Sequence, residues 1–239
     1  MKEKVMNGLE KFSKAMLSPL SYISAAGLIL VLGALLTSTS LSAMIPVLQW
    51  TPIKLLGQLI YNCIMVIINN LSLMFCVGIA AALAKKNKQQ AAIIGLMSYF
   101  MYLTAGNVTL TQLGMLAEAD PMVGLYGTGQ STVFGIQTVD MGVFGGILVG
   151  LLVAKLHNKY YNIQLPPVLG IFSGTKFVPM ISLLACSALG LVMSVVWPFV
   201  QTGLGFMGEI IYDTGMAGSV IYGLAERALL PFGLHHFIY

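Results

Sequence analysis

The sequence predicts an all-α polytopic membrane protein with about six transmembrane helices, and three observations lead to this fold class. Hydrophobic residues fill 57% of the 239 positions, mean hydropathy is +0.87, and only 8% of residues are charged, against about 25% in a soluble domain. The apolar residues gather in runs near the roughly 20 residues that a spanning helix needs. Most basic residues lie in clusters between those runs. This composition excludes a disordered chain, and the scattered net charge of +4 argues against a nucleic-acid partner.

Six segments are apolar enough to be counted as membrane spans. They cover residues 19–40, 55–84, 91–105, 139–154, 178–200 and 216–234. Ahead of them, residues 1–18 alternate lysines with apolar side chains, which is typical of an amphipathic helix lying on an anionic leaflet. A cleaved signal peptide is the rival interpretation, but no small-residue cleavage site precedes the first span. The last span contains charged residues, which makes it the weakest of the six.

The lysines set the predicted orientation. With the N-terminus inside the cell, ten of the twelve basic residues fall on the inner side and Lys54 falls outside. The ten are Lys2, Lys4, Lys11, Lys14, Lys85, Lys86, Lys88, Lys155, Lys159 and Lys176. Because basic residues near span ends favour the cytoplasmic side, this split supports both the count of six and the direction.

Two connections do not have the pattern of simple helices. Residues 106–138 are rich in Gly, Thr and Gln but keep apolar side chains, so we expect an ordered lid or hairpin on the outer side. Residues 165–179 are apolar but contain three prolines and two glycines. Such a segment predicts broken or re-entrant backbone, which survives at membrane depth only when protein or a wet cavity surrounds it.

The fourth predicted span carries Gly142, Gly146 and Gly150 at intervals of four residues. Glycines at this spacing share one helix face and let another backbone approach, so they predict a dimer or inter-helix contact. The pattern is common in membrane helices, and a glycine-rich helix without a special partner is the alternative. The three cysteines lie inside apolar runs without metal-site spacing, and we interpret them as packing residues.

The C-terminal stretch holds the candidate binding residues Glu226, Arg227, His235 and His236. Ionised groups in an apolar segment are retained near a polar pathway, and guanidinium and imidazole groups suit the hydroxyls of a sugar. Alternatively, Glu226 and Arg227 snorkel at the inner interface. The adjacent histidines point about 100° apart on a helix and make poor metal ligands, so we expect no metal. Motifs for a cofactor or for a hydrolase are not seen in the sequence, so we also expect no cofactor and no catalytic residue of a hydrolase type. His157 falls in an inner loop, where we expect it to be solvated.

Four stretches then carry a resemblance to a known family. They are residues 12–19 with 25–30, 78–86, 156–179, and 226–239. Together they resemble the membrane-embedded IIC component of the bacterial phosphoenolpyruvate-dependent sugar phosphotransferase system, in the glucose/glucoside superfamily. The sequence around His157 and His235 looks most like that of the maltose and α-glucoside members, whereas Phe232 after Pro231 looks more like the glucose members.

The resemblance implies a function and partners. Such a protein lies in the bacterial inner membrane among lipid, works as a homodimer, and moves sugar by an elevator-like motion of a transport domain against a scaffold domain. A phosphorylated IIB partner then transfers its phosphoryl group from a cysteine to the sugar. By motif match, Arg227 and His235 contact the sugar or lie near the transferred group, with Glu226 and His236 as neighbours. Whether the chain itself counts as an enzyme stays open, because the covalent chemistry belongs to IIB.

One departure bears on the organisation. Family members are much longer, and their second half holds the rest of the transport domain with an acid in a GITE-like motif that this sequence lacks. We therefore expect an interfacial helix at residues 1–18, a scaffold domain at 19–205, and only the opening of the transport domain at 206–239. The chain is then an N-terminal fragment of a sugar permease. A natively short, non-transporting dimeric scaffold or interaction module is the alternative.

Overall fold

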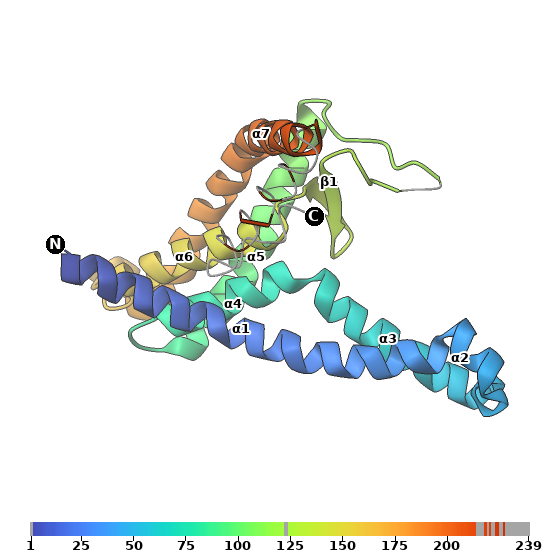
Figure 1. Cartoon of the computed structure of the whole chain (residues 1–239). Helices are drawn as coiled ribbons and strands as arrows, with labels where there is room; N and C mark the ends of the chain where they lie inside the picture. Colours follow the sequence, from blue (N-terminus) through green and yellow to red (C-terminus); the bar gives the residue numbers. More distant parts are fainter. Residues whose placement is uncertain are drawn as a thin grey trace.

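The computed structural model describes residues 2–121 and 124–213, together with positions 218, 220, 223, 224 and 227. Helices dominate it (Figure 1). In chain order the elements are α1 (Lys2–Thr37), α2 (Thr39–Met44), η1 (Pro46–Gln49), α3 (Thr51–Asn69), α4 (Leu71–Leu83), α5 (Lys88–Gln112), β1 (Gln130–Val133), β2 (Ile136–Val139), α6 (Val143–Tyr160), η2 (Pro167–Phe172), η3 (Gly174–Lys176) and α7 (Phe177–Asp213).

The first half of α1 packs on α4, whereas its second half pairs with α3 in a long arm that extends away from the other helices (Figure 1). With 36 residues, α1 is about 54 Å long, which exceeds the roughly 30 Å of a hydrocarbon core. The predicted interfacial segment 1–18 thus runs into the first predicted span without a break, and Pro19 lies inside the helix. Gly33 allows α3 to approach, because a Cβ atom there would stand 2.8 Å from the backbone nitrogen of Tyr61.

The predicted span 55–84 is wrong as a single helix, because the chain breaks between α3 and α4. At the break Asn70 leaves helical geometry, and its side-chain amide donates to the carbonyl oxygen of Val66 at 2.8 Å. An asparagine side chain that bonds nearby backbone competes with the helical ladder and so ends a helix. The break places a polar pair, Asn69 and Asn70, in the middle of an otherwise apolar stretch.

Helices α4 to α7 make the packed part of the molecule. Helix α4 lies between α5 and α6, and α5 packs along α7. The interior of this four-helix bundle combines large buried side chains with small ones that let the helices pack closely. The largest fully buried residues are Tyr99, Ile79, Leu103, Leu110, His157, Val149 and Val153. We call the end of this bundle near β1 and β2 the hairpin end, and the end at the turn 84–87 the lysine end.

The connection between α5 and α6 contains a two-stranded hairpin, which confirms the expectation of an ordered hairpin within residues 106–138. Its strands pair antiparallel with Gln130 opposite Val139. Phe134 and Gly135 form the turn with positive φ angles of 51° and 79°, the backbone that tight two-residue hairpins require. Helix α5 also extends beyond the predicted span, to Gln112. Most of the predicted broken segment 165–179 forms two short 3-10 helices, as predicted, but its last three residues already belong to the regular helix α7.

Four helices in the described part of the chain are long and apolar enough to cross a membrane: Glu10–Thr37, Thr51–Asn69, Lys88–Gln112 and Gly174–Gly203. The structure therefore supports a helical membrane protein without fixing six spans. Helix α4 is short, with 13 residues. The predicted span 139–154 is helix α6, whose last turns carry Lys155 and Lys159. The predicted span 216–234 lies almost wholly outside the described residues.

Candidate functional site

The structure covers only one of the four predicted sugar-binding residues. Arg227 has helical backbone and an exposed side chain. Glu226, His235 and His236 lie outside the described residues. Their grouping with Arg227 around a sugar therefore stays a prediction.

The three predicted packing glycines have different surroundings. Gly146 and Gly150 face α4 within the same chain: a Cβ atom on Gly146 would overlap the carbonyl oxygen of Ser72, and one on Gly150 would stand 2.8 Å from that of Cys76. Gly142 precedes α6 with a φ angle of 50° and has no atom near its Cβ position. The close approach also lets Ser72 Oγ accept a hydrogen bond from the Gly146 nitrogen at 2.9 Å, which satisfies a donor near the helix start.

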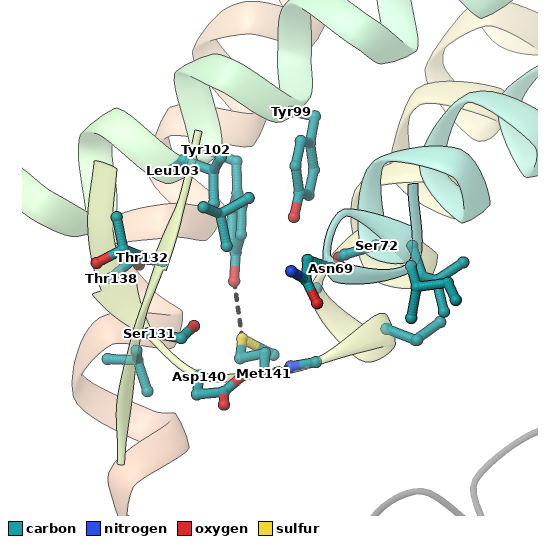
Figure 2. A pocket seen from close by; sticks show the side chains of 17 residues that line it. Asn69, Ser72, Tyr99, Tyr102, Leu103, Ser131, Thr132, Thr138, Asp140 and Met141 are labelled. Carbon is teal, nitrogen blue, oxygen red and sulfur yellow. Dashed lines mark hydrogen bonds between the residues drawn. The ribbon is translucent and has the colours of Figure 1, made fainter. Parts of the chain in front are cut away.

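A cavity of about 360 Å³ with a mixed polar and apolar lining lies at the hairpin end, between the end of α3, the start of α4, the middle of α5, the hairpin and the start of α6 (Figure 2). Its walls mix aliphatic side chains with amide, hydroxyl, phenol and carboxylate groups. The principal polar residues are Asn69, Ser72, Tyr99, Tyr102, Thr138 and Asp140. The residues come from parts of the chain up to about 70 positions apart, so no local motif announces the cavity.

Two tyrosines of α5 form one wall. Tyr99 and Tyr102 lie three positions apart, which places them on one helix face, and their ring centroids are 6.1 Å apart. The Tyr102 hydroxyl donates to Met141 Sδ at 2.7 Å (Figure 2). A thioether is a weak acceptor, so this hydroxyl keeps its capacity to bond a better partner.

Asp140 closes the cavity opposite α5, and its backbone is held firmly. Its nitrogen donates to the Gly129 oxygen at 2.9 Å, and its carbonyl oxygen accepts from Trp197 Nε1 and from Gln201 Nε2, both at 2.8 Å. One carboxylate oxygen, Oδ1, accepts from the Gly142 nitrogen at 3.0 Å. Within the described chain the carboxylate has no basic partner. It is thus a fixed negative charge with an open oxygen.

A second hollow of about 740 Å³ lies on the loop side of the hairpin, beside the exposed Tyr126. It shares Ser131, Thr132 and Asp140 with the first cavity. Asp140 therefore lies where the two hollows meet.

At the lysine end, side chains of α6 hydrogen-bond the backbone of the α4–α5 turn. We call these contacts of His157 and Asn158 the lock. Asn158 Oδ1 accepts from the Lys85 nitrogen at 2.7 Å, and Asn158 Nδ2 donates to the Leu83 oxygen at 2.8 Å. His157 Nε2 lies 2.9 Å from the Lys86 oxygen, and its Nδ1 is buried without a partner. His157 is fully buried, so the expectation of a solvated histidine is wrong. The expected inner loop is in fact the last turn of α6, and this turn directs His157 toward the α4–α5 turn.

No cluster of three or more His, Cys, Asp or Glu side chains that could hold a metal ion is found among the described residues. The polar groups that line the cavity are neutral except for the Asp140 carboxylate.

These features define a helical membrane protein with an open cavity of mixed polar and apolar lining between its helices and the hairpin. The chain belongs to the phosphotransferase system EIIC family, whose pattern matches residues 13–239. The predicted family is thereby confirmed.

Three relatives give the range of similarity. The maltose-specific EIICB component of Escherichia coli K12 is 35% identical over 229 residues, 96% of this chain and 43% of that protein. The glucoside-specific EIICBA component of Staphylococcus carnosus is 36% identical over 244 residues, 99% of this chain and 35% of the relative. The glucose-specific EIICBA component of Staphylococcus saprophyticus is 34% identical over 235 residues, which cover 98% of this chain and 34% of that protein. The chain thus spans less than half the length of the curated relatives it matches.

Proposed function

We propose that the protein serves sugar uptake across the bacterial inner membrane coupled to phosphorylation, with glucose or an α-glucoside such as maltose as substrate. The observation that carries this proposal is the family match over residues 13–239, which includes the stretch with Arg227 and His235. The relatives are named for maltose, glucosides and glucose, which supports this substrate class.

The roles of the C-terminal residues follow from the chemistry of phosphoryl transfer. A sugar hydroxyl attacks the phosphorus, the bond to the cysteine sulfur of the IIB partner breaks, and the hydroxyl proton leaves. The protein contributes positioning and charge stabilisation to such a step. Arg227 supplies a fork of donors for the transferred group, and His235 bonds a sugar hydroxyl, with Glu226 and His236 completing the polar environment. The names of the relatives join EIIC to B components, which supports a IIB partner.

The proposed orientation places the N-terminus and the lysine end in the cytoplasm, where the phosphoryl donor acts. The lock from His157 and Asn158 supports it, because it holds the end of α6 beside Lys85 and Lys86 and so gathers basic residues of two connections at one end. The proposed architecture keeps the divisions 1–18, 19–205 and 206–239. It also keeps a homodimer in lipid, for which the exposed apolar faces of α1 and α3 offer surface.

The test is Arg227→Lys in the product of the whole gene, assayed in membrane vesicles with phosphorylated IIB and radiolabelled glucose or maltose. We expect phosphorylation to fall by about a hundredfold or more, because a fork of donors becomes a point charge. Lys88→Arg, a charge-conserving change at an exposed position of the lysine end, is the matched control and keeps the wild-type rate. Wild-type rates for Arg227→Lys would overturn the role of this residue.

The second candidate, a non-transporting dimeric scaffold, is favoured by the exposed apolar faces of α1 and α3. The same vesicles separate the two functions. A scaffold leaves the sugar unphosphorylated even with the wild-type sequence and active IIB.

A further inference from the structure

We propose that the cavity at the hairpin end is a second sugar site, which binds one neutral glycosyl unit through the Asp140 carboxylate and the hydroxyl groups around it. This inference rests on the proposed function and extends it, because it assigns the sugar a binding place apart from the predicted Arg227 and His235 residues. The argument comes from the open hydrogen-bonding groups of the cavity, its charge and its position.

The cavity presents polar groups whose capacity the described chain does not use. Ser131 pairs with Thr138 across the hairpin, so both side chains leave the same face. Neither hydroxyl has a hydrogen-bond partner in the described structure, nor does the Asn69 amide, and Asp140 keeps one open carboxylate oxygen. Figure 2 shows the Asn69 side chain pointing into this space. Polar groups that line a hollow without protein partners are matched by a ligand or by water.

The kinds of groups favour a sugar. A pyranose ring offers adjacent hydroxyls that both donate and accept, and these match an amide, a carboxylate and side-chain hydroxyls taken together. The stacked pair of Tyr99 and Tyr102 supplies an apolar wall for the C–H face of such a ring. The volume of about 360 Å³ falls within the roughly 300–1,000 Å³ of small-molecule sites.

The charge excludes other occupants. A single carboxylate without a basic side chain repels phosphate, so the site takes the neutral sugar and rejects its phosphorylated product. A lipid chain would bury Asp140 and the hydroxyls without partners, which is unfavourable by several kcal/mol. A bound cation needs more oxygen ligands than one carboxylate and a few neutral groups arranged around it.

The position of the cavity at the hairpin end indicates from which side a sugar would reach it. In the proposed orientation the hairpin end faces outward, and the second hollow meets the cavity at Ser131 and Asp140. A sugar that enters from the loop side reaches Asp140 first. The Asp140 backbone is fixed through Trp197 and Gln201 on α7, so the carboxylate is preorganised before the ligand arrives.

The chain contains its own reporter for this site. Trp197 bonds the Asp140 carbonyl directly and is 8% exposed. The other tryptophan of the sequence, Trp50, is 66% exposed at the tip of the arm. In a Trp50→Phe background, Trp197 emission therefore reports ligand binding beside Asp140.

The experiment titrates this single-tryptophan protein with glucose and maltose in phospholipid nanodiscs. Glycosidic detergents are avoided because their head groups are sugars. We expect a saturable change in Trp197 emission that Asp140→Asn weakens by about tenfold, since a hydrogen bond to a charged group is replaced by one to an amide. Thr138→Val, which keeps shape and removes a hydroxyl, also weakens it. Glu118→Gln, an exposed acid in the same connection that does not line the cavity, is the matched control and leaves the titration unchanged.

Each outcome decides the inference. No saturable response to either sugar in the unaltered background overturns it, as does an undiminished response in Asp140→Asn with unchanged Trp197 emission before sugar is added. A response to dodecane that equals the response to sugar assigns the cavity to an alkyl chain and also overturns it. Arg227→Lys separates the two proposals: a retained Trp197 titration with lost phosphorylation supports both. A response abolished in Asp140→Asn together with no phosphorylation by the unaltered protein supports the cavity site and refutes the proposed function.

Discussion

Gly146 is the position where an added methyl group meets the most resistance. Its Cβ atom would overlap the carbonyl oxygen of Ser72, which belongs to the backbone of α4 and does not rotate away. The Gly146 nitrogen also donates to Ser72 Oγ, so separating the helices strains a second contact. Gly145, one position earlier in the same helix, is a matched control, because its nearest contact would be the Tyr102 hydroxyl at 3.4 Å.

The magnitude follows from three contributions. Overpacking against backbone destabilises by about 3 kcal/mol, the upper end of the usual range. Weakening the hydrogen bond to Ser72 adds about 1 kcal/mol, and replacing glycine by alanine in a helix recovers about 1 kcal/mol. Gly146→Ala is therefore expected to lower the free energy of unfolding by about 3 kcal/mol, which corresponds to a midpoint lower by roughly 6–12 °C. Gly145→Ala is expected to be neutral or stabilising by up to about 1 kcal/mol.

Thiol reactivity on heating measures both variants. Cys76 and Cys186 are fully buried, whereas Cys63 is exposed and is first replaced by serine. Labelling of the two buried thiols by a thiol-reactive fluorophore then gives the unfolding midpoint in detergent. Equal midpoints for Gly146→Ala and Gly145→Ala would refute the reasoning, because they would show that α4 and α6 are not in close backbone contact.

Two further predictions concern the lock and the arm. Asn158→Ala removes both side-chain bonds that fasten the α4–α5 turn, so tryptic cleavage after Lys85 should become several-fold faster, while Asn158→Asp, which keeps the acceptor, should be intermediate; unchanged cleavage would contradict the lock. Gly33→Ala should lower the midpoint of helix loss on heating, followed by circular dichroism, because its Cβ would stand 2.8 Å from α3 backbone, whereas Gly27→Ala, with no atom within 4 Å, should leave that midpoint unchanged; equal effects would argue against close α1–α3 packing.

The secondary structure was predictable wherever composition changes along the chain. The hairpin in 106–138 and the broken backbone of 165–179 follow from glycine, proline and threonine content, and both are present. The break at Asn70 escaped because hydropathy averaged over a window hides two asparagines in an apolar run of 30 residues. Adjacent asparagines were the available signal, since their side chains compete for backbone bonds.

The cavity was not predictable because tertiary packing alone assembles it. Asn69, Tyr102 and Asp140 belong to three elements, and each has an ordinary explanation in its local sequence. His157 shows the same limit. Its place in a predicted inner loop indicated a solvated side chain, whereas helix α6 continues through this residue, directs it toward the α4–α5 turn and buries it. Residue type and local charge do not determine which face of a helix a neighbour covers.

The placement of close contacts argues that the cavity is held in a fixed shape. Gly146 brings α6 onto α4 at one side of it. Gly190 lets α7 pack closely on α5, because a Cβ atom there would stand 2.5 Å from the backbone carbonyl oxygen of Tyr102. Trp197 then ties the same helix α7 to the backbone of Asp140. Close contacts thus hold the walls formed by α4 and α6 together, and α7 joins α5 to the backbone of Asp140. A binding place of this kind loses little entropy when a ligand enters. Asn69 ends α3 and lines the cavity, so a movement of the arm would carry one polar group of the site with it.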